Sequence, residues 1–176
     1  MLESKLLQTA PPPLSAAAPV IEVRWATAAD RAAVVKVLQR AFADYDGRLQ
    51  PPPGALGETE SSVRAHLQRG GSVALAFIEG APVGAMFVER KGGALFLSRV
   101  SVVPEKRGSG ITARMVALAE ALARGAGVGG LTLRVREVLA QNLALFQRLG
   151  FRETGRHGHE DKPETVMIDM RKDLPD

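Results

Sequence analysis

The chain has 176 residues, 45% of them hydrophobic, and a mean hydropathy close to zero, as expected of one soluble globular domain. It has no cysteine, which excludes disulfide bonds, thiolate catalysis and cysteine-ligated metals. No apolar run approaches the roughly 18 residues of a membrane span. The net charge of +4 comes from dispersed cations and aromatic residues make up only 5%, so neither a nucleic acid nor a membrane is expected as a partner.

Residues 1–19 are rich in Pro, Ala and Ser and predict a flexible tail, followed by a single domain over residues 20–176. The tail lacks the continuous apolar core of a secretory signal, so we expect a cytoplasmic location. Residues 20–25 alternate in polarity and predict the first strand. Thr27 and Asp30 then form a capping-box-like helix start. One face of the following helix carries Val34, Val37, Leu38, Ala41 and Phe42.

A loop is predicted over residues 43–57, because the helical pattern breaks at residues 44–47 and again at the prolines of residues 51–53. Long loops in compact domains are often functional. A short helix is expected over about residues 58–69. Residues 72–79 and 82–89 and the segment from Ala94 are hydrophobic runs joined by glycine turns, which predicts antiparallel hairpins.

A strand, a glycine loop and a long helix follow over residues 95–125. The strand stops at Pro104, and the helix begins at about Ile111 and is expected to end at Gly125. Its predicted buried face is Ile111, Met115, Leu118 and Leu122, with a small-residue stripe of Ala113, Ala117 and Ala121 that allows close approach to a sheet. Residues 131–135 form the next strand, so this unit predicts a crossover, local parallel pairing and a mixed α/β sheet.

The loop before the long helix has the features of an anion site. Helix N-termini present N–H groups without intrahelical partners, and glycines at 108 and 110 allow a phosphate to approach the backbone closely. Lys106 and Arg107 add two cations at the lip of the loop. The alternative is a solvated basic turn without a ligand.

The segment Val100–Pro104 followed by residues 107–112, Arg-Gly-Ser-Gly-Ile-Thr, resembles the acyl-CoA-binding motif of the GNAT acyltransferase superfamily. Arg107 and Gly110 fit that motif, whereas Thr112 stands where a second small residue is usual. Downstream, Asn142 with residues 145–151, Leu-Phe-Gln-Arg-Leu-Gly-Phe, resembles the second GNAT signature. The resemblance covers about residues 20–174.

The resemblance implies the GNAT fold, with a mixed, mostly antiparallel sheet of about seven strands flanked by about four helices and splayed between the fourth and fifth strands. It also implies acetyl-CoA as the co-substrate and no metal. Helix capping alone is the open alternative for Asn142. The implied cofactor-binding residues are Val100, Ser101, Val102, Arg107, Gly108, Ser109, Gly110, Ile111, Thr112, Ala113, Asn142 and Phe146.

The resemblance also suggests acceptor-side residues. The segment after the first helix usually forms part of the acceptor pocket in GNAT enzymes, so Phe42, Tyr45 and Asp46 are candidates, with core packing as the alternative for Phe42. His157 and His159 are expected on a polar, glycine-flanked loop that borders this pocket. Two histidines are too few to predict a metal.

The chemistry of acyl transfer needs a polarised carbonyl, an amine base and a proton donor for the leaving thiolate. By resemblance the main-chain N–H of Val102 polarises the carbonyl. Many relatives place a tyrosine where this chain has Phe146. Three alternatives follow: Tyr45 or a water supplies the proton, the thiolate leaves without that help, or the protein is a weak catalyst. The candidate bases are Glu137, His157, His159, Glu89 and Asp46, each of which can equally be salt-bridged or solvated.

Two other functions compete with an N-acetyltransferase that acts on a primary amine of a small molecule or protein. Gly108, Gly110 and Ala113 also satisfy the dinucleotide fingerprint G-x-G-x-x-A of an oxidoreductase. Residues 104–107 separate this fingerprint from the end of the strand, where it should begin. The hairpins before residue 95 also leave no room for a doubly wound sheet, so both features argue against an oxidoreductase. A non-catalytic acyl-CoA sensor is a further alternative, because Phe146 cannot donate a proton and no residue is an obvious base. The chain is expected to be a monomer or a homodimer.

Overall fold

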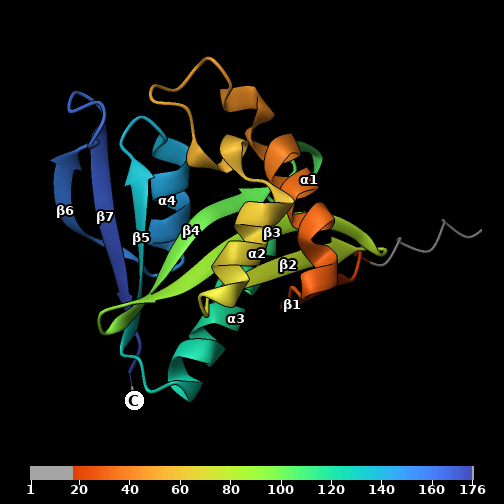
Figure 1. Cartoon of the computed structure of the whole chain (residues 1–176). Helices are drawn as coiled ribbons and strands as arrows, with labels where there is room; N and C mark the ends of the chain where they lie inside the picture. Colours follow the sequence, from red (N-terminus) through yellow and green to blue (C-terminus); the bar gives the residue numbers. More distant parts are fainter. Residues whose placement is uncertain (1–17, 176) are drawn as a thin grey trace, which may run out of the picture.

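A single mixed sheet of seven strands, in the order β1-β2-β3-β4-β5-β7-β6, organises the computed structural model, which describes residues 18–175 (Figure 1). The strands are β1 Ile21–Trp25, β2 Ser72–Ile78, β3 Ala81–Lys91, β4 Ala94–Val102, β5 Gly130–Arg136, β6 Arg152–Gly158 and β7 Val166–Asp173. The helices are α1 Arg31–Phe42, α2 Glu60–Gln68, α3 Ile111–Gly125 and α4 Ala140–Arg148. Short 3-10 turns lie at Ala28–Asp30, Ala43–Tyr45, Gly54–Gly57 and Pro104–Lys106. The predicted fold class is confirmed.

Most of the expected N-terminal tail, residues 1–17, lies outside the described residues. The division into a tail and one domain therefore stays a prediction, as do the cytoplasmic location and the monomeric or homodimeric state. No helix within residues 18–175 combines the length and the apolar character needed to cross a membrane.

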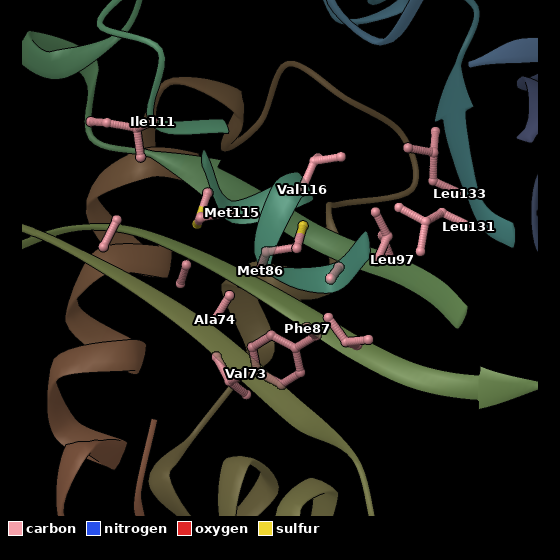
Figure 2. Packing of buried hydrophobic residues seen from close by; sticks show 14 of the residues in the cluster. Val73, Ala74, Met86, Phe87, Leu97, Ile111, Met115, Val116, Leu131 and Leu133 are labelled. Carbon is pink, nitrogen blue, oxygen red and sulfur yellow. The ribbon is translucent and has the colours of Figure 1, made fainter. Parts of the chain in front are cut away.

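The helices cover the two faces of the sheet. In Figure 1, α1 and α2 lie in front of the strands and α3 lies behind them. Side chains on β3 alternate between these faces, since Phe87 stacks on His66 of α2 with ring centroids 4.8 Å apart, whereas Gly84 faces Ile111 of α3. Figure 2 shows Met115 of α3 in the same buried cluster as Leu97 of the sheet.

The start of the first helical segment is fixed by Asp30. Its carboxylate accepts hydrogen bonds from Arg24 at 2.8 and 2.9 Å and from the Thr27 N–H at 2.7 Å. These bonds, chiefly that from Arg24, hold the pKa of the Asp30 carboxyl well below its usual range. The predicted capping box of Thr27 and Asp30 is confirmed.

The buried face of α3 differs from the predicted one. The exposed stripe is Ala113, Ala117 and Ala121, and the buried residues are Ile111, Thr112, Met115, Val116, Ala119 and Ala123. The buried row advances from Ile111 in steps of four, so its later members are alanines and the larger Leu118 and Leu122 are only half-buried. Alanine fits either face, which is why the pattern did not distinguish the two stripes.

The end of α3 also differs from the prediction. Gly125 is the last helical residue, and the left-handed residue is Gly127, with φ of 61°. The Val128 N–H donates to the Ala123 carbonyl at 2.9 Å and the Gly127 N–H to the Arg124 carbonyl at 3.1 Å. These two bonds form a Schellman motif, in which the carbonyls of the last helical turn are satisfied.

Strands β4 and β5 pair in parallel over only three residues. Leu95, Phe96 and Leu97 lie opposite Leu131, Thr132 and Leu133, although β4 continues to Val102 and β5 to Arg136. The strands therefore separate beyond this point, as predicted from the GNAT resemblance. The other strand pairs are antiparallel, so the described residues do not form the parallel, doubly wound sheet that a dinucleotide-binding oxidoreductase requires.

A β-bulge accompanies this separation. On β3, Phe87 lies opposite Ser98 and Ala85 lies opposite Ser101, so one β3 residue faces both Arg99 and Val100. Arg99 takes the left-handed conformation, with φ of 49°. Its guanidinium pairs with Glu58 and lies over the Phe87 ring, 5.2 Å from the centroid. The bulge changes the direction of β4 close to the point where its pairing with β5 ends.

The last strand pair corrects the expected polar loop at His157, whereas His159 does lie in the turn that follows. Residues 152–158 form β6, in which His157 lies opposite Met167 of β7. β6 lies at the edge of the sheet and nearly all its side chains are exposed. A strand without a buried face has no hydrophobic alternation, so the sequence pattern indicated a loop.

We predict that Gly84→Ala lowers the free energy of unfolding by about 1–3 kcal/mol. A Cβ at this position would lie 2.8 Å from Ile111 Cγ2, and Ile111 is buried at the start of α3. Urea denaturation measures the change. Gly93→Ala is the control, because a Cβ there meets nothing within 4 Å. Equal stability of the two variants would contradict the predicted close contact.

Candidate functional site

A cavity of about 450 Å³ lies at the ends of four elements: α1, β4, α3 and α4. Its walls come from segments distant in sequence, namely Ala41, Phe42, Tyr45, Val100, Ser101, Val102, Lys106, Arg107, Gly108, Gly110, Ile111, Thr112, Ala113, Gln141, Asn142, Leu145, Phe146 and Arg148. The cavity contains eleven of the twelve predicted cofactor-binding residues, Ser109 being the exception. The structure therefore brings the two sequence motifs together at the separation of β4 and β5.

The last residues of β4 offer unpaired backbone groups to this cavity. The Val103 N–H donates to the Val83 carbonyl of the preceding strand segment at 2.9 Å. Because N–H and C=O groups alternate in direction along a strand, those of Val102 point to the opposite edge of β4. That edge has no β5 partner beyond Leu97. The Val102 N–H is therefore available to a bound carbonyl oxygen.

Ser101 is oriented differently from its two neighbours. Its hydroxyl donates to the Ala85 carbonyl at 3.0 Å, and its side chain is buried. By strand alternation its main-chain groups point toward β3, while those of Val100 and Val102 point into the gap. The backbone groups of Val100 and the N–H of Val102 are thus the β4 groups that face the gap, while the Val102 carbonyl accepts a hydrogen bond from Arg107.

The start of α3 forms a second set of free N–H groups. Gly110 is the N-cap residue, with φ of 80°, and no side chain caps the helix. The N–H groups of Ile111, Thr112 and Ala113 consequently lack intrahelical acceptors and lie at the cavity wall. A Cβ on Gly108 or Gly110 would meet nothing within 4 Å, so the space in front of the loop is open. This arrangement favours a bound anion.

The Arg107 side chain connects two walls of the cavity. Its Nε donates to the Val102 carbonyl at 3.2 Å, and its Nη2 donates to the Ala41 carbonyl near the end of α1 at 2.8 Å. Asp44 lies 3.7 Å from Nη1. The guanidinium was predicted to contact phosphate, and two of its nitrogens are already engaged by main-chain carbonyls. Lys106 and Arg148 supply further positive charge at the cavity.

Helix α4 contributes a further group of residues to the cavity lining. Asn142 lines it from the first turn, but Leu139 is the N-cap residue and no side chain caps α4, so helix capping is not the role of Asn142. Phe146 is 5% exposed and packs edge-on against Phe151, with ring centroids 5.7 Å apart. No hydroxyl is present where many GNAT relatives have a tyrosine.

The expected acceptor-side aromatics also line the cavity. Phe42 and Tyr45 are half-buried, with ring centroids 5.9 Å apart. Phe42 also packs against the hydrophobic core, so the two roles considered for it coexist. Asp46 is exposed and is not part of the lining.

The other predicted catalytic and acceptor residues do not reach this cavity. Glu137 pairs with Arg156 on the surface. His157 contacts Asp169, with Nε2 3.3 Å from Oδ2, and His159 accepts a hydrogen bond from the Asp161 N–H at 3.1 Å. Another candidate base, Glu89, lies 2.8 Å from Lys91, whose hydrogen bond is the main reason that the pKa of Glu89 is lowered.

Several cavity residues were not predicted as site residues. They are Ala41, Lys106, Gln141, Leu145 and Arg148. Lys106 was named only as a cation at the lip of the loop. Gln141, Leu145 and Arg148 follow the helical spacing i, i+4, i+7, and this row adjoins Asn142 and Phe146. The helical periodicity of α4 could therefore have identified them. Within residues 18–175, no three His, Asp or Glu side chains are placed to hold a metal ion together.

Comparison with known proteins identifies the family. Residues 33–151 match the sequence profile described as the acetyltransferase (GNAT) family, which is more than half of the chain. The chain belongs to the GNAT acetyltransferase family. The two segments that carry the GNAT-like motifs supply most of the residues that line its cavity.

Individual GNAT relatives are distant. An IAA acetyltransferase from Azospirillum brasilense is 32% identical over 91 residues, which span 52% of this chain and 59% of that relative. The ribosomal-protein-alanine N-acetyltransferase of Brucella melitensis is 25% identical, with a TM-score of 0.66 over 87% of this chain and 99% of that one. The PaiA N-acetyltransferase of Thermoplasma acidophilum, solved with coenzyme A, is 15% identical, with a TM-score of 0.73 over 88% and 99% of the two chains.

We predict that Gly110→Asp weakens coenzyme A binding about 10- to 100-fold relative to Gly110→Asn. Both side chains tolerate the left-handed backbone of Gly110 better than most residues do, but only the carboxylate repels a phosphate at the α3 N-terminus. Isothermal titration calorimetry measures the affinities. Thermal unfolding of both variants checks that their folds are equally stable.

Equal affinities of the Asp and Asn variants would show that no phosphate lies near Gly110. Gly125→Asp provides a remote control, because Gly125 is exposed at the other end of α3 and does not line the cavity.

Proposed function

We propose that the protein is an N-acetyltransferase that transfers the acetyl group of acetyl-CoA to a primary amine of a small molecule or a protein. One observation supports this function above all. The free N–H groups at the start of α3 and the free edge of β4 open onto the same cavity. The first set suits the pyrophosphate of a nucleotide cofactor, and the second suits an extended amide-containing arm that ends in a carbonyl.

The residues present fit such a co-substrate. The open space before Gly108 and Gly110 leaves room for phosphate groups, and Lys106 adds a cation. The co-substrate supplies an activated thioester. The Val102 N–H would stabilise the negative charge that develops on the thioester oxygen, as an oxyanion donor does. Arg107 holds this segment of β4 in place through the Val102 carbonyl.

Few of the side chains that line the cavity are suited to proton transfer. Among the described residues that line the cavity there is no carboxylate and no histidine, and Tyr45 carries the only phenolic hydroxyl. The acceptor amine therefore loses its proton to water or arrives unprotonated. We assign to Tyr45, which lines the cavity, the return of a proton to the leaving thiolate. Glu137 is not proposed as the base, because it pairs with Arg156 outside the cavity.

A non-catalytic acyl-CoA sensor is the second candidate function. Phe146 favours it, because a phenyl ring at this position cannot donate a proton. The sensor and the enzyme share the same cofactor site and differ in turnover alone.

Two measurements test the proposed function. Calorimetric titration should show binding of acetyl-CoA and none of NAD. A thiol-release assay with acetyl-CoA and a broad panel of primary amines should then detect turnover. Binding of acetyl-CoA without thiol release from any amine would favour the sensor, and binding of NAD alone would refute both.

We predict that Tyr45→Phe lowers kcat about 100-fold and leaves the KM for acetyl-CoA nearly unchanged. General-acid assistance typically contributes a factor of this size. The substitution keeps the aromatic contact with Phe42, so the cavity wall is preserved. Steady-state kinetics with the best amine of the panel measures both parameters.

The double variant Tyr45→Phe, Phe146→Tyr is the matched test. It moves the hydroxyl to position 146, which also lines the cavity, and a restored kcat would show that the proton donor can act from either position. An unchanged kcat in Tyr45→Phe alone would assign reprotonation of the thiolate to water.

A further inference from the structure

Arg136, the last residue of β5, carries a buried charge without a partner. Its side chain is 9% exposed, and its Nη1 atom has no hydrogen-bond partner among residues 18–175. It also takes part in no ion pair within that part of the chain. Burial lowers the pKa of its guanidinium, and no neighbouring carboxylate opposes this effect.

The direction of Arg136 follows from strand pairing. Phe96 of β4 lies opposite Glu89, two residues along β3 from Phe87, and therefore on the face of the sheet that α2 covers. Thr132 of β5 is the neighbour of Phe96. Side chains at 132, 134 and 136 share this face, so Arg136 lies on the α1 and α2 side of the sheet, opposite to the side on which α3 packs.

Arg136 stands beside the gap between the strands, although it is not one of the residues that line the cavity. The last β4–β5 pair is Leu97 with Leu133, and Arg136 is three residues beyond it on β5, as Val100 is on β4. The free backbone groups of β4 therefore lie across the gap from Arg136. An acceptor that approaches the acyl group from the α1 and α2 face passes this residue.

The neighbours of Arg136 on this face do not neutralise it. Arg134 is paired with Asp169, at 2.7 Å between Nε and Oδ1, and the residue opposite Arg136 on β7 is Met167. The loop between α1 and α2 arches over this end of the molecule in Figure 1, and its Gln50 carbonyl accepts a hydrogen bond from the Thr165 hydroxyl at 2.8 Å. This loop therefore reaches the residue that precedes β7, the strand that pairs with β5.

A buried guanidinium without a partner is destabilising, because it loses its hydration and gains no compensating charge. It does not escape this penalty by losing its proton, since arginine stays charged in proteins. A ligand carboxylate would satisfy two of its N–H groups at once. A phosphate can pair with the same guanidinium fork, so a phosphate-bearing amine serves as the competing acceptor.

We propose that Arg136 binds a carboxylate of the acceptor, so that the preferred acceptors are amines that also carry a carboxylate, such as amino acids or chain termini bearing one nearby. The inference rests on the proposed N-acetyltransferase function. Arg136 fixes the position of the acceptor, and the amine is then held at the gap between β4 and β5.

The test compares amino acids with their amides as acceptors. Thiol release gives kcat/KM for each acid and for the matching amide, in the wild type, in Arg136→Met and in Arg134→Met. An amide differs from its acid in the basicity of its amine as well as in its charge. The informative quantity is therefore the acid-to-amide ratio in each variant relative to that ratio in the wild type.

We expect this ratio to fall about 10- to 100-fold in Arg136→Met, the value of a charge-assisted hydrogen bond. Arg134→Met should keep the wild-type ratio, since Arg134 is exposed on the same strand face and is paired with Asp169. We also expect Arg136→Met to raise the melting temperature of the free protein, because it removes an unpaired buried charge. A residue that served only packing would lower the melting temperature and leave the ratio unchanged.

A binding measurement separates this inference from the proposed function. With coenzyme A present, N-acetyl amino acids should raise the melting temperature of the wild type more than N-acetyl amino acid amides do, and this difference should vanish in Arg136→Met. Absence of thiol release from every amine would refute the proposed function alone. An unchanged acid-to-amide ratio in Arg136→Met, or a stronger preference for 2-aminoethyl phosphate than for amino acids, would overturn the carboxylate site.

Discussion

The early end of the β4–β5 pairing is the constraint on which the site depends. Beyond Leu97 and Leu133 neither strand has its partner, so the backbone groups of Val100 and Val102 face an open gap. Unpaired backbone groups are unfavourable unless a ligand or water satisfies them. The bulge that turns β4 is held by Arg99, whose left-handed backbone is disfavoured by about 1–3 kcal/mol. The buried Glu58 carboxylate pairs with Arg99 and also accepts a hydrogen bond from Ser62 near the start of α2.

This arrangement links the scaffold to the chemistry. Helix α2 and β4 are tied through Glu58, and the end of α1 is tied to β4 through Arg107. The cavity is therefore built from the ends of elements that are each anchored in the core. Sites held by anchored elements keep donor and acceptor groups in a fixed orientation, which is the main requirement when the acyl group is already activated.

Much of the fold could be predicted from the sequence, because its signals are local. Glycine turns marked the hairpins, and the Thr27–Asp30 pattern marked the approach to α1. The bulge at Arg99 could not be predicted, since neither glycine nor asparagine signals it and its partner Glu58 is distant in sequence. The buried row of α3 was missed because Ala119 and Ala123 differ from the exposed alanines only in their neighbours.

The candidate site was predictable where a motif marked it, as at Gly108, Gly110, Asn142 and Phe146. Glu137, His157 and His159 are not among the residues that line the cavity: Glu137 directly follows β5, and the two histidines lie at the end of β6 and in the turn after it.

The polar edge strand β6 has a consequence for association between molecules. Its exposed side chains include Arg152, Glu153 and Arg156, which pair with one another or with nearby acids. If a strand from another copy paired with β6, these charged side chains would lose hydration, which is unfavourable. Extension of the sheet at β6 by a second molecule is therefore disfavoured, as is amyloid-like stacking through this edge.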